Sequence, residues 1–290
     1  MRRLPAALLV VVAAVGVTAA VAQTGREDAR PAAARPAAEL PAANAVLPRA
    51  PKQMAATLTA TTRRLRAAIG RWDPARAVPA SVTYHALHHQ RLLRFMAARR
   101  ALGDGALRRL PRSVRGEARD TVIGLRRLAA IPRDPRHLPA TRITTAARAA
   151  ALRRDYAAAQ RRFGIHWSVL AAINFVESAF GRIRSASESG AKGPMQFLPS
   201  TWRQYGMGGD IGDPHDAILG AANLLHSAGA PRDLDRALFA YNHSTDYVRA
   251  VRRFAARMRS DERAYLAYYA WQVFVRTPSG SHRVTGPGHT

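Results

Sequence analysis

The sequence of 290 residues contains no cysteine, so no disulfide can stabilise it and any folded part depends on its hydrophobic core. Acidic residues and lysines are also scarce: 19 acidic residues face 45 basic ones, a net charge of +26, and Lys52 and Lys192 are the only lysines. The arginine excess has two interpretations, the bias of an Arg- and Ala-rich genome or attraction to a polyanion. No helix-turn-helix, zinc-finger or RNA-binding aromatic motif is present, so nucleic acid is not expected as a partner.

Phosphate-binding loops and clusters of metal ligands are absent as well, and we therefore expect no cofactor and no metal. The one suggestive group is His85, His88 and His89, which fall on one helix face at metal-ligand spacing. Because no further ligand lies nearby in the sequence, we interpret them as solvated surface histidines.

One long apolar run is present, over residues 4–22, directly after Arg2 and Arg3. It ends in Ala-Val-Ala, a small-residue pattern typical of a cleavage site, which predicts a signal peptide over residues 1–22 and export to the cell envelope or beyond. An uncleaved single-span anchor is the alternative, since the run approaches the length that crosses a bilayer. Residues 23–51 are rich in Ala and Pro and predict a disordered linker.

Helical periodicity begins near Lys52 and predicts a basic helical unit over residues 52–130, with helices at about 52–69, 81–102 and 113–129. Gly103 and Gly105 are expected to interrupt the second helix. Basic residues concentrate in this half: residues 23–140 carry 23 basic and 8 acidic side chains, net +15, against 19 and 11, net +8, for residues 141–276. A proline-rich connector is predicted over residues 131–140.

Residues 141–276 form the second predicted unit. Helices are expected at about 143–163, where Gly164 ends the helix, and from about 169 to 180, followed by short helices after Pro199, Asp213, Asp233 and Ser244. A last aromatic helix is expected at about 261–276, with most of its rings in the core, and residues 277–290 are expected to be a disordered tail. No convincing strand pair is visible, so the predicted fold class is all-α.

Glu177 is the most unusual residue of this unit, because it lies in the nearly continuous apolar run of residues 169–180. Leu170, Ile173, Glu177 and Phe180 are three or four residues apart, which places the carboxyl group within an apolar helical stripe. Loss of water around such a group raises its pKa toward the range of a general acid. The sequence therefore predicts a catalytic acid if a cleft lies beside it.

Three blocks in a fixed order accompany this acid. The first is Glu177 followed by Ser178 at a helix end, the second is SESGAKGPMQ at residues 187–196, and the third is AYN at residues 240–242. Together they resemble the catalytic domain of soluble lytic transglycosylases, bacterial muramidases with a goose-lysozyme-like helical fold. The resemblance covers about residues 151–258. Pro194 departs from it, because the family has Leu there, and proline removes a backbone donor and stiffens the loop.

The resemblance implies an all-α, lysozyme-like (goose-type) catalytic domain over residues 141–276, preceded by the small helical bundle. It implies that Glu177 is the catalytic residue, first protonating the leaving oxygen and then deprotonating the C6 hydroxyl of the same N-acetylmuramic acid. The product is a 1,6-anhydro sugar end, and no water is consumed. By the same resemblance the residues that bind the glycan strand are Ser178, Met195, Gln196, Tyr241 and Asn242.

Structural interpretations remain open for each of these residues: a helix cap for Ser178, core packing for Met195, a buried phenol for Tyr241 and a C-cap for Asn242. Two other functions remain open as well. One is a hydrolytic muramidase that uses water and an aspartate of residues 210–216 as base. The other is a wall-binding module without turnover. The expected partners are peptidoglycan glycan strands and, through residues 52–130, anionic wall or membrane polymers.

Overall fold

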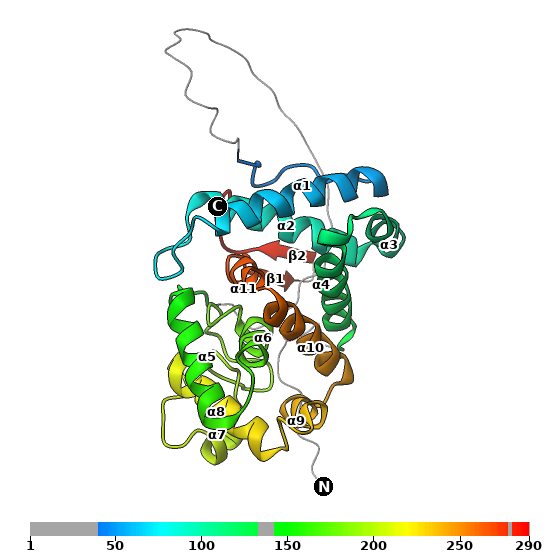
Figure 1. Ribbon diagram of the computed structural model, residues 1–290. Coiled ribbons are helices and arrows are strands. Elements are labelled where there is room, and N and C mark those ends of the chain that lie inside the picture. The colour runs from blue at the N-terminus through cyan, green and yellow to red at the C-terminus, as the bar shows by residue number, and fades with distance from the viewer. Residues whose placement is uncertain (1–39, 133–141, 278–279, 290) are drawn as a thin grey trace.

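The computed structural model describes residues 40–132, 142–277 and 280–289, and these form eleven helices and one β-hairpin (Figure 1). The predicted all-α class is confirmed. The predicted signal peptide, most of the linker and most of the connector lie outside the described residues. Within these three described ranges, no helix combines the length and the apolar character that crossing a membrane requires.

The first four helices make a basic layer at one end of the molecule (Figure 1). They are α1 (Pro51–Ile69), α2 (Ala80–Ala98), α3 (Arg100–Arg109) and α4 (Arg112–Ala130). α1 begins with proline at its first turn, where the missing N–H costs nothing. It buries Met54, Leu58 and Leu65, which the 3.6-residue period places on one face.

Gly103 and Gly105 lie inside α3 and do not interrupt a helix, so this expectation is wrong. The break falls earlier, at Arg99, and the glycines serve close packing. A Cβ at Gly103 would be 2.2 Å from the backbone oxygen of Met96, and one at Gly105 would be 3.1 Å from the Pro51 ring. Glycine is needed here for space between helices.

The three histidines of α2 are buried, with exposed fractions of 5% for His85, 9% for His88 and 2% for His89, so the expectation of solvated histidines is wrong. The reason is that α2 packs against α1, α4 and α11 (Glu262–Tyr269), which leaves it little free surface. Burial, together with the charge of Arg91, lowers the pKa of His88 to about 4. His88 is therefore neutral at pH 7.

The second unit contains α5 (Ala149–Phe163), α6 (Trp167–Ser178), α7 (Pro199–Tyr205), α8 (Pro214–Ser227), α9 (Leu234–Tyr241) and α10 (Thr245–Ser260). Two predicted signals are confirmed. Gly164 ends α5 in the left-handed conformation with φ of 72°. Asp213 caps α8 by accepting the N–H of Asp216.

α10 joins the two units, because it packs against α4 on one side and α6 on the other. Contact with α4 is close: a Cβ at Gly124 would be 2.7 Å from the Phe254 ring. A single hydrophobic core runs from Met54 in α1 to Trp271 beyond α11. The basic layer is thus part of the body that carries Glu177.

The C-terminal segment differs from the predicted long helix and disordered tail. α11 ends at Tyr269, and β1 (Phe274–Thr277) then pairs antiparallel with β2 (Gly280–Arg283). The segment is held because the Arg283 guanidinium donates to backbone oxygens of Thr285 and Gly288. The rings of α11 and Trp271 lie in the core, as expected.

Candidate active site

Glu177 lies one residue before the end of α6 and is only 1% exposed, although it is an acid. α6 is apolar on almost its whole circumference and packs against α5, α10 and α11. Folding therefore carries the carboxyl group into the interior. This confirms the buried acid that the sequence predicts.

The chain reverses sharply after α6, with φ of 52° at Ala179, 64° at Phe180 and 82° at Gly181. Two of these residues are not glycine, and each left-handed residue with a side chain costs about 1 kcal/mol or more. Ser178 holds the reversal: its hydroxyl accepts the N–H of Gly181 at 2.8 Å and donates to the backbone oxygen of Pro194. Ser178 thus links the end of the Glu177 helix to the next block, and a direct contact with sugar stays a prediction.

Residues 193–196 form a tight loop closed by reciprocal backbone hydrogen bonds between Lys192 and Phe197, at 2.8 and 2.9 Å. Gly193 has φ of 74°, and a Cβ there would be 1.8 Å from the backbone oxygen of Ile211, so only glycine fits. The side chain of Gln196 turns back and donates to the Gly193 oxygen at 3.0 Å.

Met195 and Gln196 are buried within this loop, at 0% and 4% exposure. Pro194 lacks an N–H, yet its carbonyl is the acceptor for Ser178. The substitution of proline for the family's leucine is therefore compatible with the link between the loop and α6. Binding of sugar by Met195 and Gln196 stays a prediction.

Two tyrosines complete the surroundings of Glu177. Tyr247, near the start of α10, donates from its hydroxyl to Glu177 Oε1 at 2.7 Å. Tyr241, at the end of α9, donates to the backbone oxygen of Met195. Their rings are nearly parallel, with centroids 6.4 Å apart and an angle of 6°.

Burial raises the pKa of both tyrosines well above its ordinary value of 10, and the charge of Glu177 raises it further. Both hydroxyls therefore keep their protons at neutral pH and act as donors. The phenol that contacts the acid is Tyr247, whereas Tyr241 holds the loop of Met195.

Tyr247 is a site residue that sequence reasoning missed, because its place in the apolar stripe of α10 indicates only core packing. The sequence did contain a chemical indication that the two residues could be partners. A buried phenol requires a hydrogen-bond partner, and Glu177 is a buried acid that requires a donor.

Asn242 follows Tyr241 and is 1% exposed. Its backbone N–H closes α9 on Leu238, as the C-cap interpretation expects, but its side-chain amide has no hydrogen-bond partner among the described residues. The same holds for the amide of Asn174, one turn before Glu177 on α6. Buried amides are normally paired, so these two are open to water or to a polar ligand.

The other charged candidates are engaged elsewhere. Asp213 and Asp216 accept backbone N–H groups at 3.1 and 2.9 Å, and Asp210 accepts the N–H of Gly212. The two arginines that follow α6 also bond to the backbone. Arg182 donates to the backbone oxygen of Ala179, and Arg184 donates to that of Gly212. His243 is exposed and contacts the Phe239 ring.

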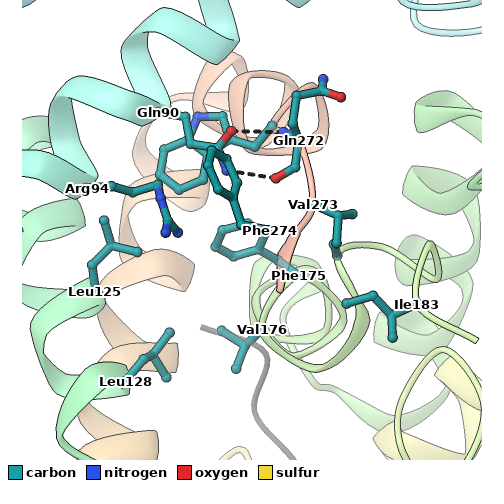
Figure 2. A pocket seen from close by; sticks show the side chains of 12 residues that line it. Gln90, Arg94, Leu125, Leu128, Phe175, Val176, Ile183, Gln272, Val273 and Phe274 are labelled. Carbon is teal, nitrogen blue, oxygen red and sulfur yellow. Dashed lines mark hydrogen bonds between the residues drawn. The ribbon is translucent and has the colours of Figure 1, made fainter. Parts of the chain in front are cut away.

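A separate small cavity of about 50 Å³ lies behind α6, between α2, α4 and β1 (Figure 2). Its wall is mostly apolar and includes Phe175 and Val176. Gln90, which also lines the cavity, joins α2 to the C-terminal segment through two hydrogen bonds between its side chain and the backbone of Gln272, at 2.8 and 2.9 Å. A space of this size holds one or two waters and not a sugar.

The helical fold is consistent with a lysozyme-like domain. Residues 156–264 match the family model described as the Transglycosylase SLT domain. The resemblance found in the sequence is confirmed. Searches of curated proteins and of solved structures returned no match.

This match indicates a transglycosylase-type enzyme that processes glycan, and it implies peptidoglycan as the substrate. Because family members act on the cell wall, a place in the cell envelope is indicated.

Proposed function

We propose that the chain is an exported lytic transglycosylase that cleaves the β-1,4 linkage between N-acetylmuramic acid and N-acetylglucosamine and leaves 1,6-anhydro-N-acetylmuramic ends. Glu177 is the general acid and base. The observation that carries the proposal is the setting of this acid: it is 1% exposed, and its Oε1 accepts from the neutral hydroxyl of Tyr247.

The reaction needs one carboxyl group in two protonation states. Protonated Glu177 gives its proton to the glycosidic oxygen, and the bond from C1 of the muramic sugar to that oxygen breaks. The C6 hydroxyl of the same sugar then attacks C1 and loses its proton to the Glu177 carboxylate. One C–O bond breaks, one forms, and the acid returns to its starting state without water.

Tyr247 can donate to Glu177 in both states, because a neutral phenol donates to a carboxylic acid and, more strongly, to a carboxylate. It also fixes the orientation of the carboxyl group. The proposed substrate contacts are Ser178, Met195, Gln196, Tyr241 and Asn242, of which Asn242 has an unpaired buried amide among the described residues.

The hydrolytic alternative requires a second carboxylate to activate water. The aspartates of residues 210–216 are occupied by backbone N–H groups of their own loop and helix start. This favours the reaction without water. Digestion of purified peptidoglycan followed by mass spectrometry tests the proposal, because hydrolysis adds one water to each new end.

Two further parts of the proposal lie outside the catalytic centre. Export rests on the apolar residues 4–22 and the cleavage pattern after them, and N-terminal sequencing of the secreted protein tests it. The second part is that the basic layer binds an anionic polymer of the envelope. Since α4 packs on Phe254 of α10, deletion of this layer would expose core, and charge substitution is the appropriate test.

A further inference from the structure

An open groove of about 610 Å³ runs between α1 and the end of α3. Its floor consists of small side chains of α1, of which Ala55 is buried, Thr59 and Ala60 are half-buried and Ala56 is exposed. The lining residues are Lys52, Ala55, Ala56, Thr59, Ala60, Arg63, Arg109 and Pro111. α1 lies at the opposite end of the molecule from α7, α8 and α9 (Figure 1), and neither Glu177 nor any residue that surrounds it lines the groove.

Every charged residue of this groove is basic. Lys52, Arg63 and Arg109 are exposed, and within the described ranges none of them pairs with an acid. Some arginines elsewhere in the layer are paired, Arg66 with Glu117 and Arg126 with Asp104, both at 2.7 Å, whereas others, such as the exposed Arg64 and Arg112, also have no acidic partner in the described ranges. The groove thus concentrates three uncompensated positive charges.

The charges are spaced along a line. Lys52 and Arg63 are eleven residues apart on one helix, a separation of about 16 Å along its axis. Between them the floor is formed by Ala56, Thr59 and Ala60, which are small enough for an extended chain to lie close to the helix. A ligand that uses both ends must carry several negative groups over this length.

The lining also distinguishes between kinds of anionic partner. Segments that lie on membranes present Trp, Phe or Leu to the lipid, and proteins that bind single-stranded nucleic acid present stacking rings. The groove has neither, and the large exposed hydrophobic side chains of the described residues, among them Met207 and Phe239, lie elsewhere. A flexible polymer with repeating phosphate or carboxylate groups fits best.

We infer that the groove between α1 and α3 binds an extended segment of a linear anionic polymer. This inference deepens the proposed polymer binding by the basic layer, names its site and excludes a membrane as the partner. It does not depend on Glu177. Failure of glycan cleavage and failure of polymer binding are therefore separate results.

The test is fluorescence anisotropy of full-length protein with labelled polyphosphate across a salt series. The groove variant is Lys52→Ala, Arg63→Ala and Arg109→Ala combined. We expect at least tenfold weaker binding and a slope of log affinity against log salt smaller by about two, since each cation on a flexible polyanion contributes about 0.7. Circular dichroism checks that the variant is folded.

The matched control removes the same charge elsewhere, with Arg232→Ala, Arg236→Ala and Arg249→Ala. These arginines are exposed and are also without an acidic partner in the described part of the chain. We expect less than a threefold change. Equal losses in the two triple variants would show that net charge alone binds the polymer, and would overturn the inference.

Ala56→Trp tests the shape of the groove, because Ala56 is exposed and the ring fills the floor while all three cations remain. We expect it to weaken polyphosphate binding at least fivefold, and unchanged binding would contradict the inference. Vesicles of anionic lipid and oligothymidylate serve as further probes. Groove-dependent binding to either, without groove-dependent binding to polyphosphate, would also overturn it.

Discussion

Each half of the molecule shields a glutamate from solvent, partly for Glu117 and almost fully for Glu177, and the two differ in the donors they accept from. In the basic layer, Glu117 accepts from the Arg66 guanidinium at 2.7 Å and lies 3.8 Å from His89. In the second half, Glu177 accepts from the Tyr247 hydroxyl, also at 2.7 Å. The distances are equal, but one donor is a fixed positive charge and the other is neutral.

The difference bears on the catalytic role that we propose for Glu177. Through its ion pair with Arg66, Glu117 joins α4 to α1. A buried carboxyl group beside a neutral phenol can hold or release its proton with little change in its partner. The neutral donor Tyr247 is thus compatible with the proton transfer proposed for Glu177.

Substitution of the two acids should give opposite results. We expect Glu177→Gln to lower glycan cleavage by about a thousandfold or more, because loss of a general acid removes proton transfer. Glu117→Gln should leave turnover per folded molecule unchanged. Release of soluble fragments from purified peptidoglycan measures both. If Glu177→Gln cleaved glycan at the wild-type rate, Glu177 would have no part in the mechanism.

The second test concerns the loop of residues 193–196, which is linked to the end of the Glu177 helix. Gly193→Ala forces a Cβ to within 1.8 Å of the Ile211 oxygen at a φ of 74°, and we expect a loss of about 3 kcal/mol in the free energy of unfolding. Gly190 is the matched control, since its φ is 79° but no atom lies within 4 Å of its Cβ position. Gly190→Ala should cost only about 1 kcal/mol. Urea titration measures both, and equal losses would contradict the role given to the contact with Ile211.

Local signals in the sequence were sufficient for much of this site. The acid in an apolar stripe gave the place of Glu177, and the glycine and aspartate signals gave the end of α5 and the start of α8. These features depend on residues within one or two turns of each other, where helix geometry and capping chemistry decide the outcome.

Features that depend on distant segments were not predictable in this way. Tyr247 contacts Glu177 across 70 residues of sequence, and no periodicity shows that its hydroxyl faces an acid. Gly103 looked like a helix breaker because its contact with Met96 arises only after α3 folds back on α2. The hairpin of β1 and β2 depends on Arg283, whose partners lie in turns that hydrophobic patterning does not report.

Removal of one hydroxyl tests the neutral donor itself. We expect Tyr247→Phe to lower cleavage by about ten- to thirtyfold, a loss of about 1.5–2 kcal/mol typical of a hydrogen bond to a charged group. Tyr241→Phe, whose hydroxyl contacts Met195 and not the acid, should have a smaller effect. Burial and the charge of Glu177 raise the pKa of Tyr247 above 10, so the phenol stays protonated from pH 6 to 9. Equal cleavage rates for wild type and Tyr247→Phe would contradict the role given to this hydroxyl.

The smallest expected effect concerns the stability of the basic layer. Glu117 is 11% and Arg66 27% exposed at the side chain, so solvent partly screens their ion pair. We expect Glu117→Gln to lower the free energy of unfolding by about 1 kcal/mol, as urea titration would show. A gain in stability would mean that the pair costs more in desolvation than it returns.

The most direct test of the central claim is the mass of the product ends released from purified peptidoglycan. If Glu177 acts alone as acid and base, the new muramic ends carry the 1,6-anhydro ring from the earliest time points, and digestion in H₂¹⁸O introduces no label. Ends heavier by one water, labelled with ¹⁸O in that solvent, would contradict the account and show a hydrolytic muramidase.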